Sequence, residues 1–217
     1  MPEKREIILV EKPEGLSSFG VIKILRQKLG VRKMGHAGTL DPFATGLLII
    51  GIGHGTKRMK EFEVLPKTYV MDVLLGRSTD TGDPDGKTIA EKKVSGIGKE
   101  DVEKILKEME GDIELPIPSY SAVKHKGIPL YKYARRGIAV ERKKRKTRIF
   151  GLKLMNFAIE GDKVLFRAEM KAEKGTYARA VGEEVGRRIG APAMLTALRR
   201  TKIGDIAVED AKQLKDF

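Results

Sequence analysis

Asp41 is the carboxylate whose position in the sequence best suits chemistry. It ends the stretch Gly35-His36-Ala37-Gly38-Thr39-Leu40, which has too many glycines and too little periodicity for a helix or a strand. The following Pro42 restricts Asp41 to extended conformations and has no backbone donor, so the loop can hold a short carboxylate rigidly. The alternative interpretation is a turn aspartate that hydrogen-bonds its own backbone.

A second group of chemically capable residues is Lys174-Gly175-Thr176-Tyr177-Ala178-Arg179. The pattern predicts a helix start with Thr176 as a cap and free N–H groups that an anion can bind. Arg179 falls in the first turn, where a cation gains nothing from the helix dipole. We therefore expect a carboxylate or phosphate partner for Arg179, although most arginines are simply solvated at the surface.

A third feature is the basic run Arg142-Lys143-Lys144-Arg145-Lys146, followed closely by Arg148. Like charges at this density repel one another, so we expect the run to be mobile until a polyanion neutralises it; a solvated arm is the alternative. Tyr120, Tyr131 and Tyr133 lie nearby in the sequence. They could stack on exposed bases, or they could pack the surrounding segment onto the core.

Composition narrows the class of partner. The 217 residues carry a formal net charge of +13 with a sequence pI near 9.8, which favours RNA, DNA or an anionic membrane face. There are no cysteines, which excludes disulfides and thiolate zinc sites. The three histidines, His36, His54 and His125, form no metal-binding pattern. No signal-peptide core and no apolar run of about 20 residues is present, so we expect a cytoplasmic protein without a membrane partner.

The elements that must position these residues form a mixed set. Periodicity predicts a capped helix from Ser17 or Ser18 to Gly30, a second over 99–109, and a last one bearing Val181, Val185 and Ile189. Strands are predicted over 7–10, 47–52, 68–75, 147–156 and 163–172, with loop chemistry between Gly76 and Gly86. An exposed insertion is expected from 119 to 146. Because strands and helices alternate without regular βαβ spacing, the sequence predicts an α+β fold.

Seven motifs taken together resemble one known family, the bacterial tRNA pseudouridine synthase B (TruB) family. The main motif is the Asp41 stretch with Ala44-Thr45-Gly46-Leu47-Leu48. The others follow the family's order over nearly the whole chain: Glu11-Lys12-Pro13-Glu14-Gly15-Leu16-Ser17-Ser18, Lys67-Thr68-Tyr69, Ser78-Thr79-Asp80-Thr81-Gly82-Asp83, Pro118-Ser119-Tyr120-Ser121-Ala122, Lys174 to Arg179, and Leu198-Arg199-Arg200.

The resemblance implies a fold and a domain plan. We expect a single pseudouridine synthase domain over 1–217 with a mainly antiparallel central sheet flanked by helices and loops. We also expect a mobile basic insertion over approximately 117–147 that closes on tRNA. The family's usual C-terminal PUA-type RNA-binding module is expected to be absent.

The resemblance also implies roles for individual residues. Asp41 would be the catalytic aspartate, paired with Arg179, which Asp83 would steady. Tyr69 would stack on the target base, and Tyr177 and Leu198 would line its pocket. His36 would fill the space left by nucleotides that leave the loop stack. Contacts to the RNA backbone are expected from a set of cations: Lys12, Lys57, Arg142, Lys143, Lys144, Arg145 and Lys146.

The implied activity is isomerisation of uridine to pseudouridine in the TΨC loop of tRNA, at position 55. The base would be flipped out and its glycosidic bond broken and re-formed from C5, without metal or organic cofactor. We expect a monomer that needs no protein partner. A guide-RNA-dependent synthase is one rival, against which Phe43-Ala44-Thr45-Gly46 argues. A non-catalytic RNA-binding or tRNA-folding factor is the other.

Overall fold

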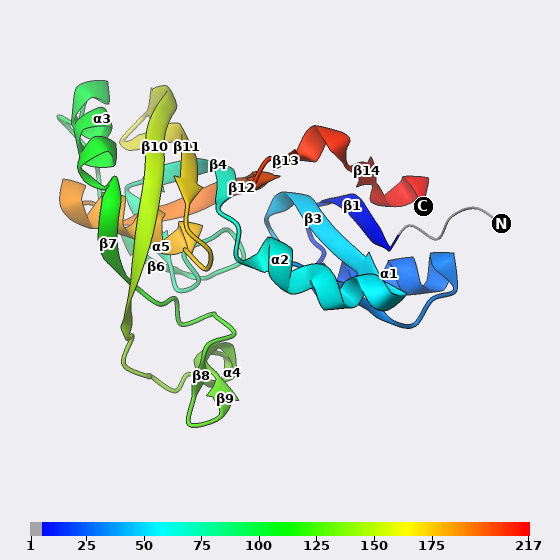
Figure 1. Ribbon diagram of the computed structural model, residues 1–217. Coiled ribbons are helices and arrows are strands. Elements are labelled where there is room, and N and C mark those ends of the chain that lie inside the picture. The colour runs from blue at the N-terminus through cyan, green and yellow to red at the C-terminus, as the bar shows by residue number, and fades with distance from the viewer. Residues whose placement is uncertain (1–5) are drawn as a thin grey trace. The chain divides into compact units, whose positions relative to one another are not determined.

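The computed structural model describes residues 6–217 (Figure 1). The chain divides into two compact units. Unit 1 consists of the residues up to Val70, with Lys171–Gly175 and Ala197–Phe217; unit 2 consists of Met71–Met170 and Thr176–Thr196. The chain passes from one unit to the other within three strands, β4 (Lys67–Leu75), β11 (Lys163–Ala172) and β12 (Ala193–Ile203).

The sheet of unit 1 is built around β3 (Thr45–Ile52), whose residues 46–51 are buried. It pairs antiparallel with β1 (Ile7–Lys12) from Ile7↔Gly51 to Lys12↔Gly46, and parallel with β12 at Arg199↔Thr45. Three short strands extend the pairing. They are β2 (Met34–His36) on β3, β13 (Ile206–Ala207) on β12 and β14 (Lys212–Gln213) on β1.

Helix α1 (Ser18–Leu29) packs an apolar face on this sheet. Ser17 caps it by accepting a hydrogen bond from the Gly20 N–H at 3.0 Å, and Gly30 ends it in the left-handed conformation. Its buried face, Val21, Ile22 and Leu25, joins a core cluster with residues of β1 and β3. The remaining helical segments of unit 1 are short: η1 (Gly53–Arg58), α2 (Met59–Glu63), η2 (Val208–Asp210) and η3 (Leu214–Asp216).

In unit 2 the strand order is β12, β4, β11, β10 (Lys144–Glu160) and β7 (Gly111–Pro116). Strand β10 pairs antiparallel with β7 from Lys144↔Pro116 to Ile149↔Gly111. The unit also contains helices α3 (Lys99–Glu108) and α5 (Ala178–Ile189) and a small hairpin of β5 (Arg77–Thr79) and β6 (Thr88–Glu91). The insertion between β7 and β10 holds three short elements: β8 (Lys124–His125), β9 (Ile128–Pro129) and α4 (Leu130–Arg135).

These elements confirm the predicted mixed fold with mainly antiparallel pairing. The sequence analysis did not anticipate β12, and it read 76–86 as loop alone, whereas β5 begins at Arg77. It was also wrong to expect a fully mobile basic run, because Lys144, Arg145 and Lys146 lie in β10 and their backbone pairs with β7. Ladder pairing fixes that backbone while the charged side chains remain exposed. The expectation of a single catalytic domain stays a prediction.

No helix within residues 6–217 is long and apolar enough to cross a membrane.

Candidate functional site

The loop that carries Asp41, residues 37–44 (the Asp41 loop), is pinned on both sides of the carboxylate. On one side, the Ser18 hydroxyl accepts from the Leu40 N–H at 2.9 Å and donates to the Leu40 carbonyl at 3.3 Å. Within the loop, the Ala44 N–H donates to the Asp41 carbonyl at 3.1 Å and closes a turn before β3. On the other side, the Gly15 N–H donates to the Pro42 carbonyl at 2.9 Å. The half-buried Asp41 therefore has its main chain held on both sides, and its catalytic role stays a prediction.

Lys12 contributes to this bracing from inside the protein. Its side chain is buried, and the ammonium donates to the carbonyls of Pro13, Leu16 and Pro42, the last at 3.1 Å. Burial lowers the pKa of Lys12 to about 8, against the attraction of Asp41, which raises it. The predicted contact of Lys12 with the RNA backbone does not fit this position. An ammonium enclosed by three carbonyls positions the loop instead.

Arg200, on β12, is a second buried cation of unit 1. The side chain is 1% exposed, and its guanidinium donates from Nε to the Leu47 carbonyl at 2.8 Å and from Nη2 to the Gly38 carbonyl at 3.2 Å. Nη1 lies 3.5 Å from the Thr39 carbonyl, and a further hydrogen bond links the guanidinium to the side chain of Tyr69. One planar group therefore ties the start of the Asp41 loop to β3 and to Tyr69.

Lys67, at the start of β4, is a third buried cation of the same unit. Its ammonium donates to the carbonyls of Phe62, Glu63 and Leu65, at 3.2, 2.5 and 2.6 Å, and so caps the end of α2. Burial lowers the pKa of Lys67 to about 8, and repulsion from Arg200 acts in the same direction. A cluster of cations that all bind carbonyls keeps its positive charge, which favours anions near the Asp41 loop.

His36 lies directly before the Asp41 loop, at the end of β2. Burial lowers the pKa of His36, with a second contribution from the nearby Arg200, so the neutral ring is favoured. Its Nδ1 is buried without a hydrogen-bond partner among residues 6–217. The expectation that His36 replaces displaced nucleotides stays a prediction.

Tyr69 and Leu198, expected at the target base, both belong to unit 1. Tyr69 is 9% exposed on β4 and Leu198 is 6% exposed on β12. Neighbouring strands thus supply an aromatic ring and an aliphatic side chain, the two kinds of surface that a flipped pyrimidine can contact. Their roles stay predictions.

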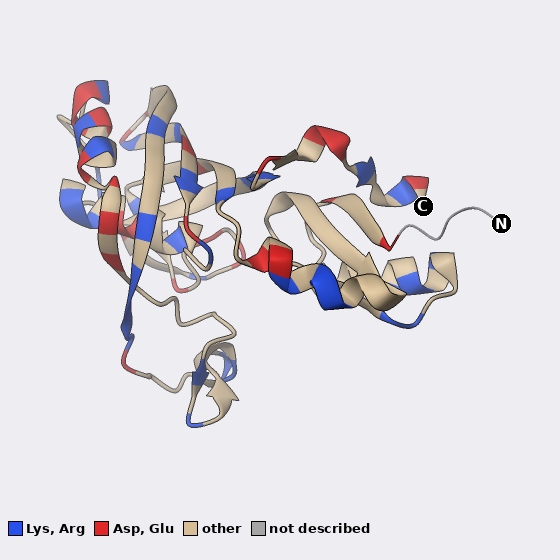
Figure 2. Ribbon diagram, viewed as in Figure 1, with Lys and Arg blue, Asp and Glu red and all other residues tan. Residues whose placement is uncertain are grey.

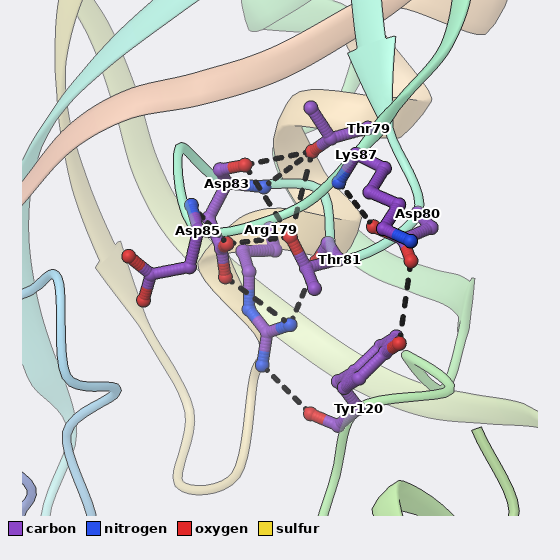
Figure 3. Close-up of polar contacts among 8 residues, drawn as sticks. All are labelled: Thr79, Asp80, Thr81, Asp83, Asp85, Lys87, Tyr120 and Arg179. Atoms are coloured by element: carbon purple, nitrogen blue, oxygen red, sulfur yellow. Dashed lines mark hydrogen bonds and ion pairs between the residues drawn. The ribbon is translucent and has the colours of Figure 1, made fainter. Parts of the chain in front are cut away.

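In unit 2, a group of polar residues is organised around Asp83, in the loop of residues 80–87 between β5 and β6 (the acidic loop; Figure 3). The Thr79 hydroxyl donates to the Asp83 carbonyl at 2.7 Å and accepts from the Asp83 N–H at 3.0 Å. The Asp83 carboxylate accepts from the Thr81 hydroxyl at 2.5 Å and from the Asp85 N–H at 3.2 Å. These bonds hold a buried carboxylate in one orientation.

Arg179, in the first turn of α5, points its guanidinium at this loop (Figure 3). Nη1 lies 3.6 Å from Asp83 Oδ2 and donates to the Thr81 carbonyl at 2.7 Å, while Nη2 donates to the Tyr120 carbonyl at 2.9 Å. Both side chains of the ion pair are buried, at 3% and 7% exposure. The expectation of a carboxylate partner for Arg179 is therefore met by Asp83. Asp41 belongs to unit 1, and its pairing with Arg179 stays a prediction.

The start of α5 differs in one detail from the predicted one. The N-cap is the half-buried Tyr177, which makes no side-chain capping hydrogen bond, and not Thr176. The Thr176 hydroxyl is instead buried against the hydroxyl of Thr147 on β10, so a tertiary contact displaces the local cap. The position of Tyr177 at the entrance of the helix is compatible with pocket lining, which stays a prediction.

Figure 2 shows that lysines and arginines are spread along the whole chain, and the other cations expected to bind RNA are among them. Lys57, in η1, is exposed, and so are Lys143, Lys144, Arg145 and Lys146. Arg142 is engaged with the protein: its Nη2 donates to Glu183 at 2.7 Å and its Nε to the Ile117 carbonyl at 3.0 Å. Arg142 therefore helps to anchor the insertion, and the exposed side chains of Lys143, Lys144 and Lys146 can meet phosphates.

No cluster of three or more histidines and carboxylates within residues 6–217 could hold a metal ion.

Sequence reasoning missed the structural roles of Lys12, Lys67 and Arg200. Each lies in a motif quoted above, yet a lysine or arginine usually points to solvent. No signal in the sequence marks them, because the groups that accept their hydrogen bonds are main-chain carbonyls, which every residue has.

Comparison with known proteins shows that this chain is similar to pseudouridylate synthases. Residues 26–178 match the N-terminal domain of the TruB family of pseudouridylate synthases. The chain is 43% identical over 208 residues to tRNA pseudouridine synthase B of Desulfotalea psychrophila, covering 94% of this chain and 84% of that protein. It is 39% identical over 211 residues to tRNA pseudouridine synthase B of Hydrogenovibrio crunogenus, covering 97% and 68%.

Similar solved structures share a lower sequence identity with this chain. A chain in the crystal structure of a Cbf5–Nop10–Gar1 complex matches with a TM-score of 0.70 and 26% identity over 97% of this chain. A chain in an H/ACA ribonucleoprotein bound to a substrate RNA containing 2′-deoxyuridine matches with a TM-score of 0.69 and 25% identity. The present chain spans about half the length of those two chains, 52% and 51%.

Proposed function

Because this chain belongs to the TruB family of pseudouridylate synthases, we propose that it isomerises uridine to pseudouridine at position 55, in the TΨC loop of tRNA. The observation that carries the proposal is the Asp41 loop, where three independent hydrogen-bonding groups fix the main chain on either side of the carboxylate: the Ser18 hydroxyl, the Gly15 N–H and the Lys12 ammonium. The relatives named tRNA pseudouridine synthase B support tRNA as the substrate.

In the proposed reaction the target nucleotide leaves its stacked loop, at a cost of a few kcal/mol. Stacking on Tyr69 and burial against Leu198 return part of that cost. Ionised Asp41 then begins cleavage of the glycosidic bond between N1 and C1′, as a nucleophile at the sugar or as a base. The released uracil turns, and a bond forms between C5 and C1′ as the bond from Asp41 to C1′ breaks or, in the base route, as Asp41 returns its proton to the sugar. The C5 proton is then lost to solvent and N1 takes up a proton, so that the product is an isomer of the substrate.

Arg179 is proposed to orient Asp41 and to favour its charged form. Support comes from the geometry of unit 2, where Asp83 and two main-chain carbonyls leave the guanidinium little freedom. A rigid cation gains more from each hydrogen bond to a second carboxylate than a mobile cation does, because the entropy cost of ordering the side chain has already been met.

The enzyme is proposed to act in the cytoplasm.

The test compares the wild-type protein with two variants, each of which replaces one aspartate by asparagine. Purified protein is incubated with an unmodified tRNA transcript, pseudouridine is mapped by position, and tritium release is followed from uridine labelled at C5. Asp41→Asn should retain RNA binding and lose product formation. The control is Asp112→Asn, since Asp112 is an exposed carboxylate at the edge of β7. Tritium release that survives Asp41→Asn would show the assignment to be wrong.

Activity on a bare transcript also tests the guide-dependent alternative. The H/ACA similarity rests on about 25% identity, whereas the tRNA-modifying relatives are about 40% identical over the same chain. The relatives therefore favour a guide-independent enzyme.

A further inference from the structure

Unit 2 contains a pocket of about 290 Å³ at the base of the insertion. Its walls come from the acidic loop, from α4 and from the segments on either side of α4. Neither Asp41 nor Arg179 is among its lining residues. The pocket adjoins the Arg179 ion pair, because Asp80 belongs to the acidic loop and the main-chain carbonyl of Tyr120 accepts from Arg179. The lining residues that matter here are two aromatic, two aliphatic and two charged ones: Tyr120, Tyr133, Leu130, Ile138, Asp80 and Arg142.

The charges of this pocket are already satisfied by the protein. Asp80 accepts the Tyr120 hydroxyl at 3.2 Å and the Lys87 N–H at 2.8 Å, as Figure 3 shows. Arg142 is paired with Glu183 at 2.7 Å. Because the two charged groups at the pocket have opposite signs and bound partners, the pocket offers no net charge to a free phosphate. Its remaining surface, rings and aliphatic side chains, suits a flat uncharged group.

The surroundings of the pocket have the opposite character. Exposed cations lie close to its lining residues in the sequence: Arg135 and Arg136 at the end of α4, and Lys143 to Lys146 at the start of β10. A polyanion held by these side chains would place its uncharged parts at the pocket. A volume of about 290 Å³ lies at the small end of ligand sites, enough for one ring system and too little for a stacked pair.

We infer that this pocket binds one unpaired nucleobase of the RNA, outside the catalytic site, while the flanking cations bind the phosphates on either side of it. The inference rests on the proposed function for its ligand class. Of the three tyrosines singled out in the sequence, Tyr120 and Tyr133 line the pocket, whereas Tyr131 lies outside it with Arg135 over its ring at 5.5 Å. The base is read by stacking, and the basic run supplies the sequence-independent attraction.

The insertion provides a matched pair of residues for the test. Ile138 lines the pocket and is 49% exposed; Ile128, on β9 of the same insertion, is 40% exposed and lies outside it. Ile138→Asp and Ile128→Asp change the net charge equally, so their electrostatic effects on RNA affinity match. Only the first places a carboxylate where the base would lie. Ile138→Trp and Ile128→Trp repeat the comparison without a change of charge.

The measurement is the dissociation constant of a TΨC stem–loop transcript by fluorescence anisotropy, together with a panel in which each unpaired nucleotide in turn is abasic. Ile138→Asp and Ile138→Trp should bind about 10-fold more weakly than their Ile128 counterparts, within the range for loss of one stacked base. One abasic transcript should lose about the same factor with the wild-type protein. That transcript should lose nothing further with Ile138→Asp.

Equal affinities for the Ile138 and Ile128 variants, or losses that simply multiply for every abasic position, would overturn the inference. Pseudouridine formation by the wild-type protein, measured on the same transcript, separates the two proposals. If pseudouridine forms but no abasic position shares its loss of affinity with Ile138→Asp, only the pocket inference is refuted. If one abasic position does share that loss but no pseudouridine forms, only the proposed activity is refuted. Failure of the wild-type protein to bind the transcript overturns both.

Discussion

Replacing Arg200 should affect both stability and rate, because one buried guanidinium serves several acceptors at once. Arg200→Met leaves the carbonyls of Gly38, Thr39 and Leu47 and the Tyr69 hydroxyl without this donor. Each buried carbonyl left unsatisfied costs about 1–3 kcal/mol. The gain from no longer burying a cation offsets part of this sum. We therefore expect a net loss of about 3–5 kcal/mol in the free energy of unfolding.

The neighbouring residue supplies the control. Arg199→Met is the same substitution one position earlier on β12, where the side chain is 45% exposed and the guanidinium pairs with Glu11 at 2.6 Å. Surface ion pairs contribute about 0–1 kcal/mol, so this variant should remain close to the wild type. Arg200→Lys keeps the charge and loses the planar fork, and should lie between the two.

Urea unfolding measures the difference through the transition midpoint at constant slope. For a chain of this size, about 1 kcal/mol shifts the melting temperature by about 2–4 °C, so Arg200→Met should melt about 6–20 °C lower. At a temperature where the variants are folded, RNA affinity of Arg200→Lys should match that of the wild type. Its single-turnover rate should fall by up to about 100-fold, the effect of a misplaced loop. Equal midpoints for the Arg200 and Arg199 variants would refute this reasoning.

Three further predictions follow from the same contacts. Gly46→Ala should destabilise the fold by at least about 3 kcal/mol. Gly46 has a φ of +104°, and an added Cβ would lie 2.3 Å from a carbonyl oxygen of β12. Thermal melting should show a much smaller loss for the control Gly30→Ala, because Gly30 has a φ of +65° and its Cβ would meet nothing within 4 Å. The pKa of Lys12 is lowered to about 8, so from pH 8 to 10.5 the folded protein binds fewer protons than the unfolded chain. Urea unfolding should therefore show the wild type gaining stability relative to Lys12→Met across that window, by up to about 1.4 kcal/mol per pH unit, with no gain below it. Thr79→Val removes two hydrogen bonds to the acidic loop and should lower the single-turnover rate at unchanged RNA affinity, whereas Thr88→Val, on the exposed partner strand, should change neither.

How far the sequence alone could go depends on the range of the interactions involved. The helix cap at Ser17 and the apolar face of α1 are local patterns, and both were predictable. The partner of Arg179 was predictable in kind, since a cation in a first helical turn needs an anion, and Asp83 supplies it. The burial of Arg200 was not, because its acceptors lie more than 130 residues away and are carbonyls, which every residue has. Strand β10 was predicted too short for a similar reason: repulsion within a charged run argues for mobility, and pairing with β7 prevails.

The buried cations of unit 1 explain how a loop can be rigid and electropositive at once. Lys12, Lys67 and Arg200 all donate to main-chain carbonyls. A carbonyl oxygen accepts the hydrogen bond but carries no net charge, so the positive charge of the donor is not cancelled. A carboxylate in the same place would satisfy the bond and remove the positive potential as well. Lys12 already experiences the attraction of Asp41, which raises its pKa against the effect of burial. The atoms that fix the Asp41 loop are therefore also those that place positive charge near its carboxylate.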